Sequence, residues 1–374
     1  MMKKIGILTF HSVPNYGAML QAYALQEKLR NTGYESYIIN YKNSKIENRY
    51  KIVDITNIET LIKSFIKLML YPNKIKRNRV FYDFMKKNMK LSKRYSNEES
   101  LKKDYPEYDI YITGSDQVWN SDITHGLSDI YTLNFGGNEI QRISYAASIG
   151  KAEINDEEKE VFVEKLKILD KISVREKNGQ QILKNILNKE IETVLDPTML
   201  FEKEEWQGKV KNIEKTNEKY IVAYVVSPDE QYIKIVNDLS EKTGLKVIHF
   251  GMKNPGYKNV LKSAYTEGPL EFVNYIKNAE YVVATSFHAT VFSIIFNKKF
   301  FIIPHKKTGA RVTNLLEKLE IKNRTFSSLE EFKNIDYNFE TDWEKVNKNL
   351  EIEREKSLQW LENAINSEKG KKNV

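Results

Sequence analysis

Short apolar segments alternate with helical patterns along nearly the whole chain, and this alternation constrains the fold more than any other feature. The first unit runs from an expected strand at 4–10, through a helix with apolar residues at helical spacing that closes at Gly33, to a strand at 35–41. Strands that alternate with helices in this way are typical of βαβ units. We therefore expect an α/β fold built on parallel sheets.

The second half of the chain restarts the same order of elements. Residues 202–219 are highly charged and predict a linker, after which a strand begins at 220. A chain of 374 residues exceeds the size at which one hydrophobic core stops growing. We predict a Rossmann-like domain at 1–205, a second one at 206–340, and a closing helix with a tail at 341–374. Further strands are expected at 108–113, 142–149, 171–174, 192–195, 246–250, 281–285 and 300–303.

Composition excludes several classes of protein. The chain contains no cysteine, so disulfides, thiolate nucleophiles and thiolate metal sites are excluded. The net charge of +8 comes from lysines interleaved with glutamates, and no nucleic-acid-binding module is recognisable, so no nucleic acid partner is expected. No apolar run approaches the roughly 20 residues that span a bilayer, and the run after Lys4 is too short for a secretory signal. We expect a soluble, cytoplasmic protein.

Residues 61–94 join an amphipathic stretch, 61–70, to a dense basic cluster. One interpretation is a helix with a solvated face. The other is a peripheral contact with the inner face of the membrane, because each basic residue near anionic lipid contributes about 1 kcal/mol. The basic residues are Lys74, Lys76, Arg77, Arg79, Lys86, Lys87, Lys90, Lys93 and Arg94.

A histidine stands at the start of the apolar helix expected after the strand at 281–285. His288 therefore follows the carboxyl end of a strand, where open α/β sheets bind ligands. Imidazole is a side-chain group that gives and takes protons near neutral pH, and helix amides at this place collect anions. Two roles are open: a packed histidine that hydrogen-bonds a neighbouring loop, and an acid/base in a site.

Other segments occur in a recognisable order with this histidine helix. They are 15–26, 114–120 with 144–150, and 173–176 leading to 195–198. Together these segments resemble the polysaccharide pyruvyl transferase family and span most of the chain. The resemblance, with the order of the elements, implies a GT-B-like fold in which two Rossmann-like domains face a cleft, with a C-terminal closing helix.

The resemblance implies phosphoenolpyruvate as donor and His288 as the acid/base. Guanidinium groups suit carboxylate and phosphate because they offer a rigid bidentate fork. Many members carry an arginine two residues before the histidine, where this chain has Ser286, so the missing charge would come from a neighbouring loop. Arg175 and Arg311 are the arginines in question, and each could instead form an ordinary ion pair. The residues expected at the donor are Arg175, Arg311, Ser286 and Lys307.

The expected acceptor residues follow the first and third strands. Asn15 either caps the next helix or binds a sugar, and Trp119 either stacks on a sugar face or fills the core. The full set is Asn15, Tyr16, Gly17, Gln21, Asp116 and Trp119. For Asp196, which precedes a proline, two roles are open: a structural turn at the domain boundary, and a side chain that faces the cleft. The Gly-rich dinucleotide fingerprint and the usual metal-binding motifs are absent from the sequence, so we expect no cofactor and no metal.

These observations predict a pyruvyl transferase that forms a pyruvate ketal on a sugar of a surface polysaccharide or its lipid-linked precursor. One alternative is a GT-B glycosyltransferase that uses a nucleotide sugar, which the serine at position 286 keeps open. The other is a non-catalytic glycan-binding protein. His288 with two nearby cations argues against the second alternative, because a binding protein needs no proton shuttle.

Overall fold

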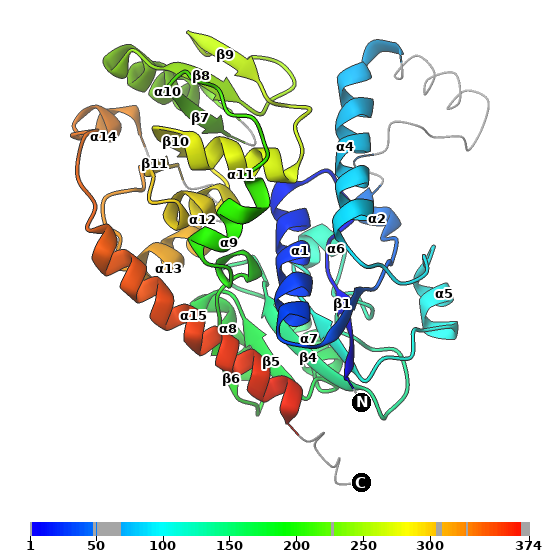
Figure 1. Ribbon diagram of the computed structural model, residues 1–374. Helices are drawn as coiled ribbons and strands as arrows, with labels where there is room; N and C mark the ends of the chain where they lie inside the picture. Colours follow the sequence, from blue (N-terminus) through cyan, green and yellow to red (C-terminus); the bar gives the residue numbers. More distant parts are fainter. Residues whose placement is uncertain are drawn as a thin grey trace. The chain divides into compact units, whose positions relative to one another are not determined.

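The chain folds into two compact α/β units, each built on one parallel sheet (Figure 1). The computed structural model describes residues 2–47, 50, 69–225, 228–303, 309–326 and 328–367. Unit 1 comprises residues 1–50, 84–201 and 351–374, and unit 2 comprises residues 51–83 and 202–350. The expected fold class, two Rossmann-like parallel-sheet domains, is confirmed.

Unit 1 contains a six-stranded parallel sheet with the order β2-β1-β3-β4-β5-β6. From β1 the chain first moves outward to β2 and then crosses back to β3. The order of the strands therefore reverses between β1 and β3, and ligands of open α/β sheets bind beyond the carboxyl ends of strands at such a point. The strands are β1 (Lys4–Leu8), β2 (Glu35–Ile38), β3 (Ile110–Thr113), β4 (Gln141–Ala147), β5 (Lys171–Val174) and β6 (Ile191–Thr193).

Helix α1 (Tyr16–Asn31) shows why unit 1 folds as it does locally. Asn15 caps it, because its Oδ1 accepts a hydrogen bond from the amide of Ala18 at 3.2 Å. Most of the helix is buried, and Gly33 with a φ of 91° turns the chain toward β2. The other helices of unit 1 are α2 (Ser44–Glu47), α5 (Glu98–Lys103), α6 (Ser121–Thr124), α7 (Asp156–Leu166), α8 (Lys177–Ile186) and the 3₁₀ turn η2 (Pro197–Met199).

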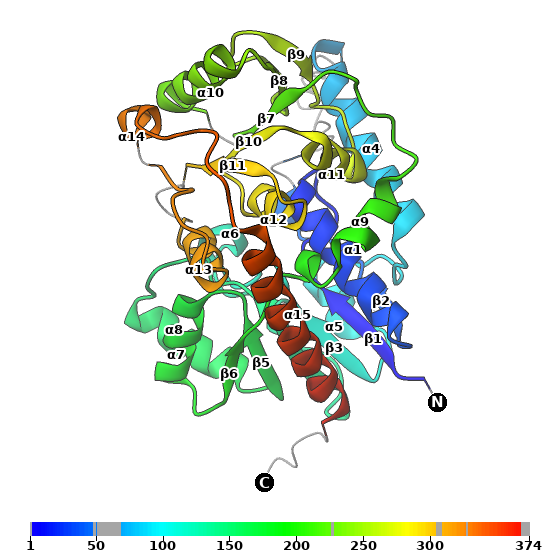
Figure 2. The same ribbon diagram turned by 60° about the vertical axis from the view of Figure 1, so that its left-hand side comes forward.

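The last helix, α15 (Trp343–Asn366), contributes its carboxyl half to unit 1 (Figure 2). Trp360 packs on Tyr145 of β4 with ring centroids 6.2 Å apart. Gln141 Nε2 donates to the carbonyl of Ala364 at 2.8 Å, and the amide of Leu195 donates to Ser357 Oγ at 3.0 Å. These contacts fix the helix against the sheet.

Unit 2 contains a five-stranded parallel sheet with the order β11-β10-β7-β8-β9. Its strand order reverses between β7 and β10, so the carboxyl end of β10 is the corresponding ligand position. The strands are β7 (Tyr220–Tyr224), β8 (Lys246–His249), β9 (Val260–Ser263), β10 (Tyr281–Ala284) and β11 (Lys299–Ile302). The helices are α9 (Lys203–Val210), α10 (Glu230–Thr243), α11 (Pro269–Asn278), α12 (Phe287–Ile295), α13 (Ala310–Lys318) and α14 (Leu329–Lys333).

Two elements of unit 2 differ from the sequence-based expectation. Much of the charged stretch predicted as a linker forms α9, where Trp206 is fully buried and meets the ring of Phe292 at 5.0 Å. Trp206 and Val210 are its buried residues, and the high density of charge around them concealed the helix. Strand β9 was not expected, because it is an exposed edge strand without an apolar run.

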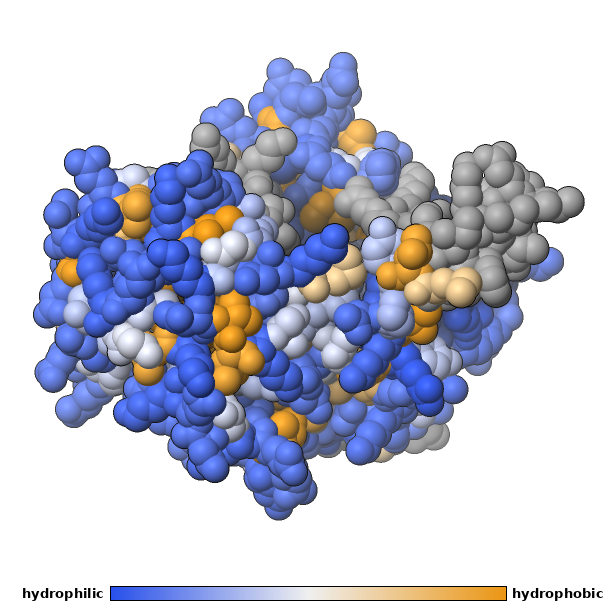
Figure 3. Space-filling model, turned by 90° about the horizontal axis from the view of Figure 1, so that it is seen from above, coloured by the Kyte–Doolittle hydropathy of each residue, from blue (hydrophilic) through white to orange (hydrophobic). Residues whose placement is uncertain are grey.

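The basic segment is described from residue 69 onward, and most of its amphipathic stretch lies outside the described residues. Helix α4 (Pro72–Asn88) carries several of its cations. Arg77 is buried and donates to the carbonyl of Tyr265 at 2.6 Å, so it does not belong to an exposed basic face. Met69 and Leu70 are exposed, at 71% and 65%. The face shown in Figure 3 is mainly hydrophilic. Within the described part of the chain, no helix has the length and apolarity to cross a membrane.

Candidate functional site

Strand β10 and helix α12 place His288 just beyond the carboxyl end of a strand, the position at which open α/β sheets bind ligands. The strand ends at Ala284, Ser286 is the N-cap, and His288 is the second residue of the helix. All residues of α12 are buried, and the carbonyl of Ser286 accepts the amide of Thr290 at 3.1 Å, so the helix start is firmly held. His288 is 6% exposed. The imidazole is therefore held in a largely dry position, close to the helix amides that favour anions.

Phe287 links His288 to the cation Arg311. The rings of Phe287 and His288 are perpendicular, with centroids 5.3 Å apart. Arg311 Cζ lies 5.9 Å from the centroid of the Phe287 ring, at the second position of α13. The structure thus brings together Ser286, His288 and Arg311 of the expected donor set. Lys307 lies outside the described residues.

Arg175, the other expected donor residue, lies in unit 1 and faces carboxylates. Its Nη1 donates to Asp196 Oδ2 at 2.8 Å, and both side chains are buried. Asp116 and Glu176 each have an oxygen 3.9 Å from the guanidinium. Burial lowers the pKa of Arg175, but the charges of Asp196, Glu176 and Asp116 outweigh it and raise the pKa. The guanidinium therefore stays charged, and carboxylates of the protein already balance its charge.

Ser115 and Gln21 connect this ion pair to the first strand. Ser115 Oγ lies 3.0 Å from Asp196 Oδ2, and the amide of Ser115 donates to Gln21 Oε1 at 3.1 Å. Gln21 Nε2 in turn donates to Thr9 Oγ1 at 2.9 Å. Gln21 is 0% exposed. Its amide therefore holds the loops after β1 and β3 together from inside the protein.

The loop after β3 presents Asp116 at its outer side. Gly114 has a φ of 105°, and a Cβ there would lie 2.2 Å from the carbonyl oxygen of Tyr145, so only glycine fits. Asp116 has a φ of 66°, and its side chain is 14% exposed. Its Oδ1 accepts the amide of Gln117 at 2.8 Å, which orients the carboxylate.

The remaining expected acceptor residues divide between the surface and the interior. Asn15 is exposed and caps α1, whereas Tyr16 and Gly17 are buried in that helix. Trp119 is 0% exposed, and its Nε1 donates to the carbonyl of Tyr131 at 3.0 Å. Only Asn15 and Asp116 of the set reach the surface of unit 1.

Sequence reasoning missed two buried polar residues near the same strand ends. Glu176 Oε1 accepts from Ser148 Oγ at 2.8 Å and from the amide of Ile149 at 3.0 Å, so it fixes the loop after β4. His11 follows β1, and its Nδ1 lies 2.9 Å from the carbonyl of Thr9. Burial lowers the pKa of His11, although its hydrogen bonds to Thr9 and Asn40 oppose this. Their sequence signal was a polar residue directly after an apolar strand.

Acidic and histidine side chains do not gather into a metal site in the part of the chain that the structure describes. In those residues no group of three or more potential ligands is arranged to hold a metal ion. What the described geometry offers is a buried imidazole and a guanidinium around Phe287 in unit 2, and an oriented carboxylate in unit 1. These are groups for proton transfer and anion binding.

Comparison with known families decides the affiliation of the chain. The sequence model of the family named polysaccharide pyruvyl transferase matches residues 15–307. The chain belongs to this family. The match extends over both units of this pyruvyl transferase family member and includes His288, Arg175 and Asp116. No curated protein sequence matches the chain.

Solved structures of similar fold include two UDP-GlcNAc 2-epimerases, one of them putative, and the protein MnaA of S. aureus. The Methanocaldococcus jannaschii enzyme, in complex with UDP-GlcNAc and UDP, is 14% identical with a TM-score of 0.50, over 94% of this chain and 99% of the other. A putative enzyme from Listeria monocytogenes is 11% identical with a TM-score of 0.52, over 100% of both chains. MnaA of S. aureus with UDP is 12% identical with a TM-score of 0.51, over 98% and 97%. At such identities the likeness shows the shared GT-B fold alone.

Proposed function

We propose that this family member transfers the enolpyruvyl-derived group of phosphoenolpyruvate to two hydroxyls of a sugar, forming a pyruvate ketal. The observation that carries the proposal is the placement of His288 at the start of α12, linked through Phe287 to Arg311, in a chain of the pyruvyl transferase family. We propose a cytoplasmic location, where the sugar would belong to a surface polysaccharide or its lipid-linked precursor.

The reaction requires one proton donor and two deprotonated hydroxyls. His288 gives a proton to the methylene carbon of phosphoenolpyruvate, which makes the neighbouring carbon electrophilic. A sugar hydroxyl attacks that carbon, and its proton returns to His288. Phosphate then leaves with the C–O bond electrons, and the second hydroxyl closes the ketal while its proton goes to phosphate. The products are the ketal and hydrogen phosphate, so no oxidant or cofactor is needed.

The anions of the donor are assigned to unit 2. Arg311 supplies a guanidinium that binds carboxylate or phosphate in a bidentate manner. The amides at the start of α12 supply further donors for an anion beside His288. Lys307 remains a proposed donor contact from the sequence. Ser286, which replaces the arginine common in the family, would donate one hydroxyl hydrogen bond in its place.

Arg175 receives a different role from the one expected from sequence. Its hydrogen bond to Asp196 and its approach to Asp116 and Glu176 mean that a bound anion would have to compete with three carboxylates. We therefore assign Arg175 as a positioning residue that supports the loop bearing Asp116. Asp116 is the proposed contact for an acceptor hydroxyl, because its carboxylate is oriented and reaches the surface.

The assay that tests the function measures inorganic phosphate released from phosphoenolpyruvate in the presence of a glycan acceptor. In deuterated solvent, the pyruvyl methyl group of the product should gain one deuterium, because the methylene carbon is protonated during transfer. Release that depends on the acceptor supports the proposal. Turnover of a UDP-sugar without phosphate release would instead assign this GT-B chain to nucleotide-sugar chemistry. The similar Methanocaldococcus jannaschii epimerase structure contains a ligand of that kind, UDP-GlcNAc.

A further inference from the structure

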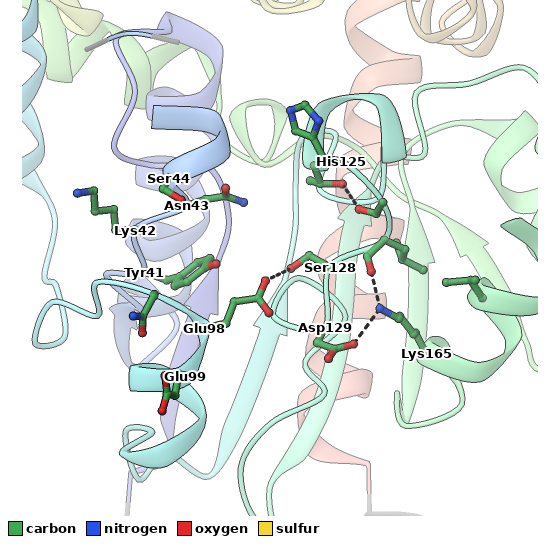
Figure 4. A pocket seen from close by; sticks show the side chains of 15 residues that line it. Tyr41, Lys42, Asn43, Ser44, Glu98, Glu99, His125, Ser128, Asp129 and Lys165 are labelled. Atoms are coloured by element: carbon green, nitrogen blue, oxygen red, sulfur yellow. Dashed lines mark hydrogen bonds and ion pairs between the residues drawn. The ribbon is translucent and has the colours of Figure 1, made fainter. Parts of the chain in front are cut away.

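A polar pocket opens in unit 1 beside the residues that follow β2 and β3. Its volume is about 690 Å³, within the range of about 300–1,000 Å³ found for small-molecule sites. One wall comes from residues 41–44 after β2, and the opposite wall from residues 124–129 after β3. Helices α5 and α7 complete it (Figure 4). Because β2 and β3 flank β1, the pocket lies near the point where the strand order reverses and ligands bind.

Groups that suit sugar hydroxyls point into this pocket. Ser128 Oγ and Glu98 Oε1 face each other at 3.4 Å (Figure 4), a long hydrogen bond that a ligand hydroxyl can replace. Tyr41 lies beside them, and burial, followed by the charge of Glu98, raises its pKa, so its phenol keeps the proton. The carboxylate accepts hydrogen bonds, while the two hydroxyls both donate and accept. Vicinal sugar hydroxyls need this mixture.

The charges in and around the pocket balance one another. Asp129 binds Lys165 at 2.9 Å and Lys102 at 2.7 Å. Burial raises the pKa of Asp129, but the two lysines outweigh it and lower the pKa, so this carboxylate is ionised and compensated. The other charged side chains of the pocket lining are Glu98, Glu99 and Lys42. Lys42, Lys102 and Lys165 therefore balance Glu98, Glu99 and Asp129, and the pocket has no net positive charge that would attract phosphoenolpyruvate or a nucleotide. A neutral ligand suits such a lining.

We propose that this pocket binds a neutral sugar ring of the glycan acceptor, with Glu98, Ser128 and Tyr41 taking its hydroxyls. Leu127 and Val161 line the pocket as well and offer a small apolar surface to the C–H face of the ring. The inference rests on the proposed function for the statement that the glycan is an acceptor. The recognition itself follows from the pocket and can be tested without donor.

Saturation-transfer NMR with neutral methyl glycosides of glucose, galactose, mannose and N-acetylglucosamine tests the pocket on the full chain. At least one glycoside should show transfer, and Glu98→Gln and Ser128→Ala should each reduce it by at least fivefold. Glu157→Gln, an exposed carboxylate on α7 outside the pocket, is the matched control and should change nothing. Transfer to none of the glycosides, or equal transfer in all four proteins, would overturn the inference.

The acceptor dependence of phosphate release separates this inference from the proposed function. If release occurs, Glu98→Gln and Ser128→Ala should raise the KM for the acceptor at least fivefold and leave the KM for phosphoenolpyruvate unchanged. An unchanged acceptor KM would overturn the pocket while leaving the function standing. Glycoside binding that depends on Glu98, without any phosphate release, would keep the pocket and remove the function.

Discussion

Arg175 and Asp196 form a buried ion pair in unit 1, with Nη1 2.8 Å from Oδ2 and less than a twentieth of either side chain exposed. Removing one partner of such a pair leaves an uncompensated buried charge. The pair therefore holds the loops after β5 and β6 together, and this structural role comes before any role in ligand binding.

Replacement of Arg175 should lower stability strongly. We expect Arg175→Ala to lose about 3–5 kcal/mol of unfolding free energy, because Asp196 stays buried without its cation. Urea unfolding followed by circular dichroism measures the change. Arg30→Ala is the control, since Arg30 forms an exposed pair with Glu27 whose removal should cost about 0–1 kcal/mol. Equal losses in the two variants would contradict the structural role.

Replacement of Arg311 should weaken donor binding and leave stability nearly unchanged. We expect Arg311→Ala to reduce phosphoenolpyruvate affinity by about 1.5–3 kcal/mol, the range for hydrogen bonds to charged groups. Arg311→Lys should recover only part, because an ammonium lacks the bidentate fork. Calorimetric titration measures the affinity, again with Arg30→Ala as control. Wild-type affinity in Arg311→Ala would exclude the residue from the donor site.

Replacement of His288 should affect turnover more than donor binding. We expect His288→Ala to lower kcat by about 10²–10⁴, the usual contribution of a positioned general acid/base. His288→Gln should not restore activity, because it keeps hydrogen bonding but cannot transfer a proton. Phosphate release and deuterium incorporation measure the loss. Full turnover in either variant would sink the proposed mechanism.

The buried histidine after β1 should make stability fall in mild acid. Burial lowers the pKa of His11 below 6.5. In mild acid, this histidine therefore binds a proton more readily in the unfolded chain than in the folded chain. The contribution of this histidine to the free energy of unfolding is therefore fully present above about pH 6.5. It is lost as the pH falls, by at most about 1.4 kcal/mol per pH unit for one proton. The pKa of His249 is lowered by burial with the same sign.

Urea midpoints at pH 7.5 and pH 5.5 check this pH dependence. His11→Gln should shrink the difference between the two midpoints, and His249→Gln should shrink it by its own share. Glu47 raises and Arg94 lowers the pKa of His11, so neither reverses the direction set by burial. A midpoint difference that is unaffected by His11→Gln would show that this histidine is protonated equally in both states.

The basic segment should bind anionic vesicles if it contacts a membrane. Flotation with vesicles should rise with acidic lipid and fall with salt, because such attraction is screened over about 10 Å at 0.1 M. Replacing the exposed cations Lys76, Lys86 and Lys87 with glutamine should abolish it. Three exposed lysines elsewhere, Lys234, Lys258 and Lys345, give the matched control. Flotation that ignores lipid charge would leave a solvated helix.

The strand–helix order was predictable from the sequence because apolar periodicity directly reports burial. The strand at Lys171–Val174 and the position of His288 after β10 follow from that pattern. The direction of polar side chains after a strand does not, because it depends on contacts between distant segments. Gln21 points inward because the amide of Ser115, which is distant in sequence, donates a hydrogen bond to its side-chain oxygen. The sequence places Ser115 just after a strand and Gln21 one turn inside a helix, but it contains nothing that pairs them.

Because Gly114 lies so close to Tyr145, the loop after β3 and the neighbouring strand β4 can change in evolution only together. Any side chain at position 114 would displace the backbone of the neighbouring strand, and with it the carboxylate that the loop presents. A homologue with another residue at this position must therefore have rebuilt both segments together. The glycine is thus a marker by which relatives that keep this loop can be told from relatives that share only the fold.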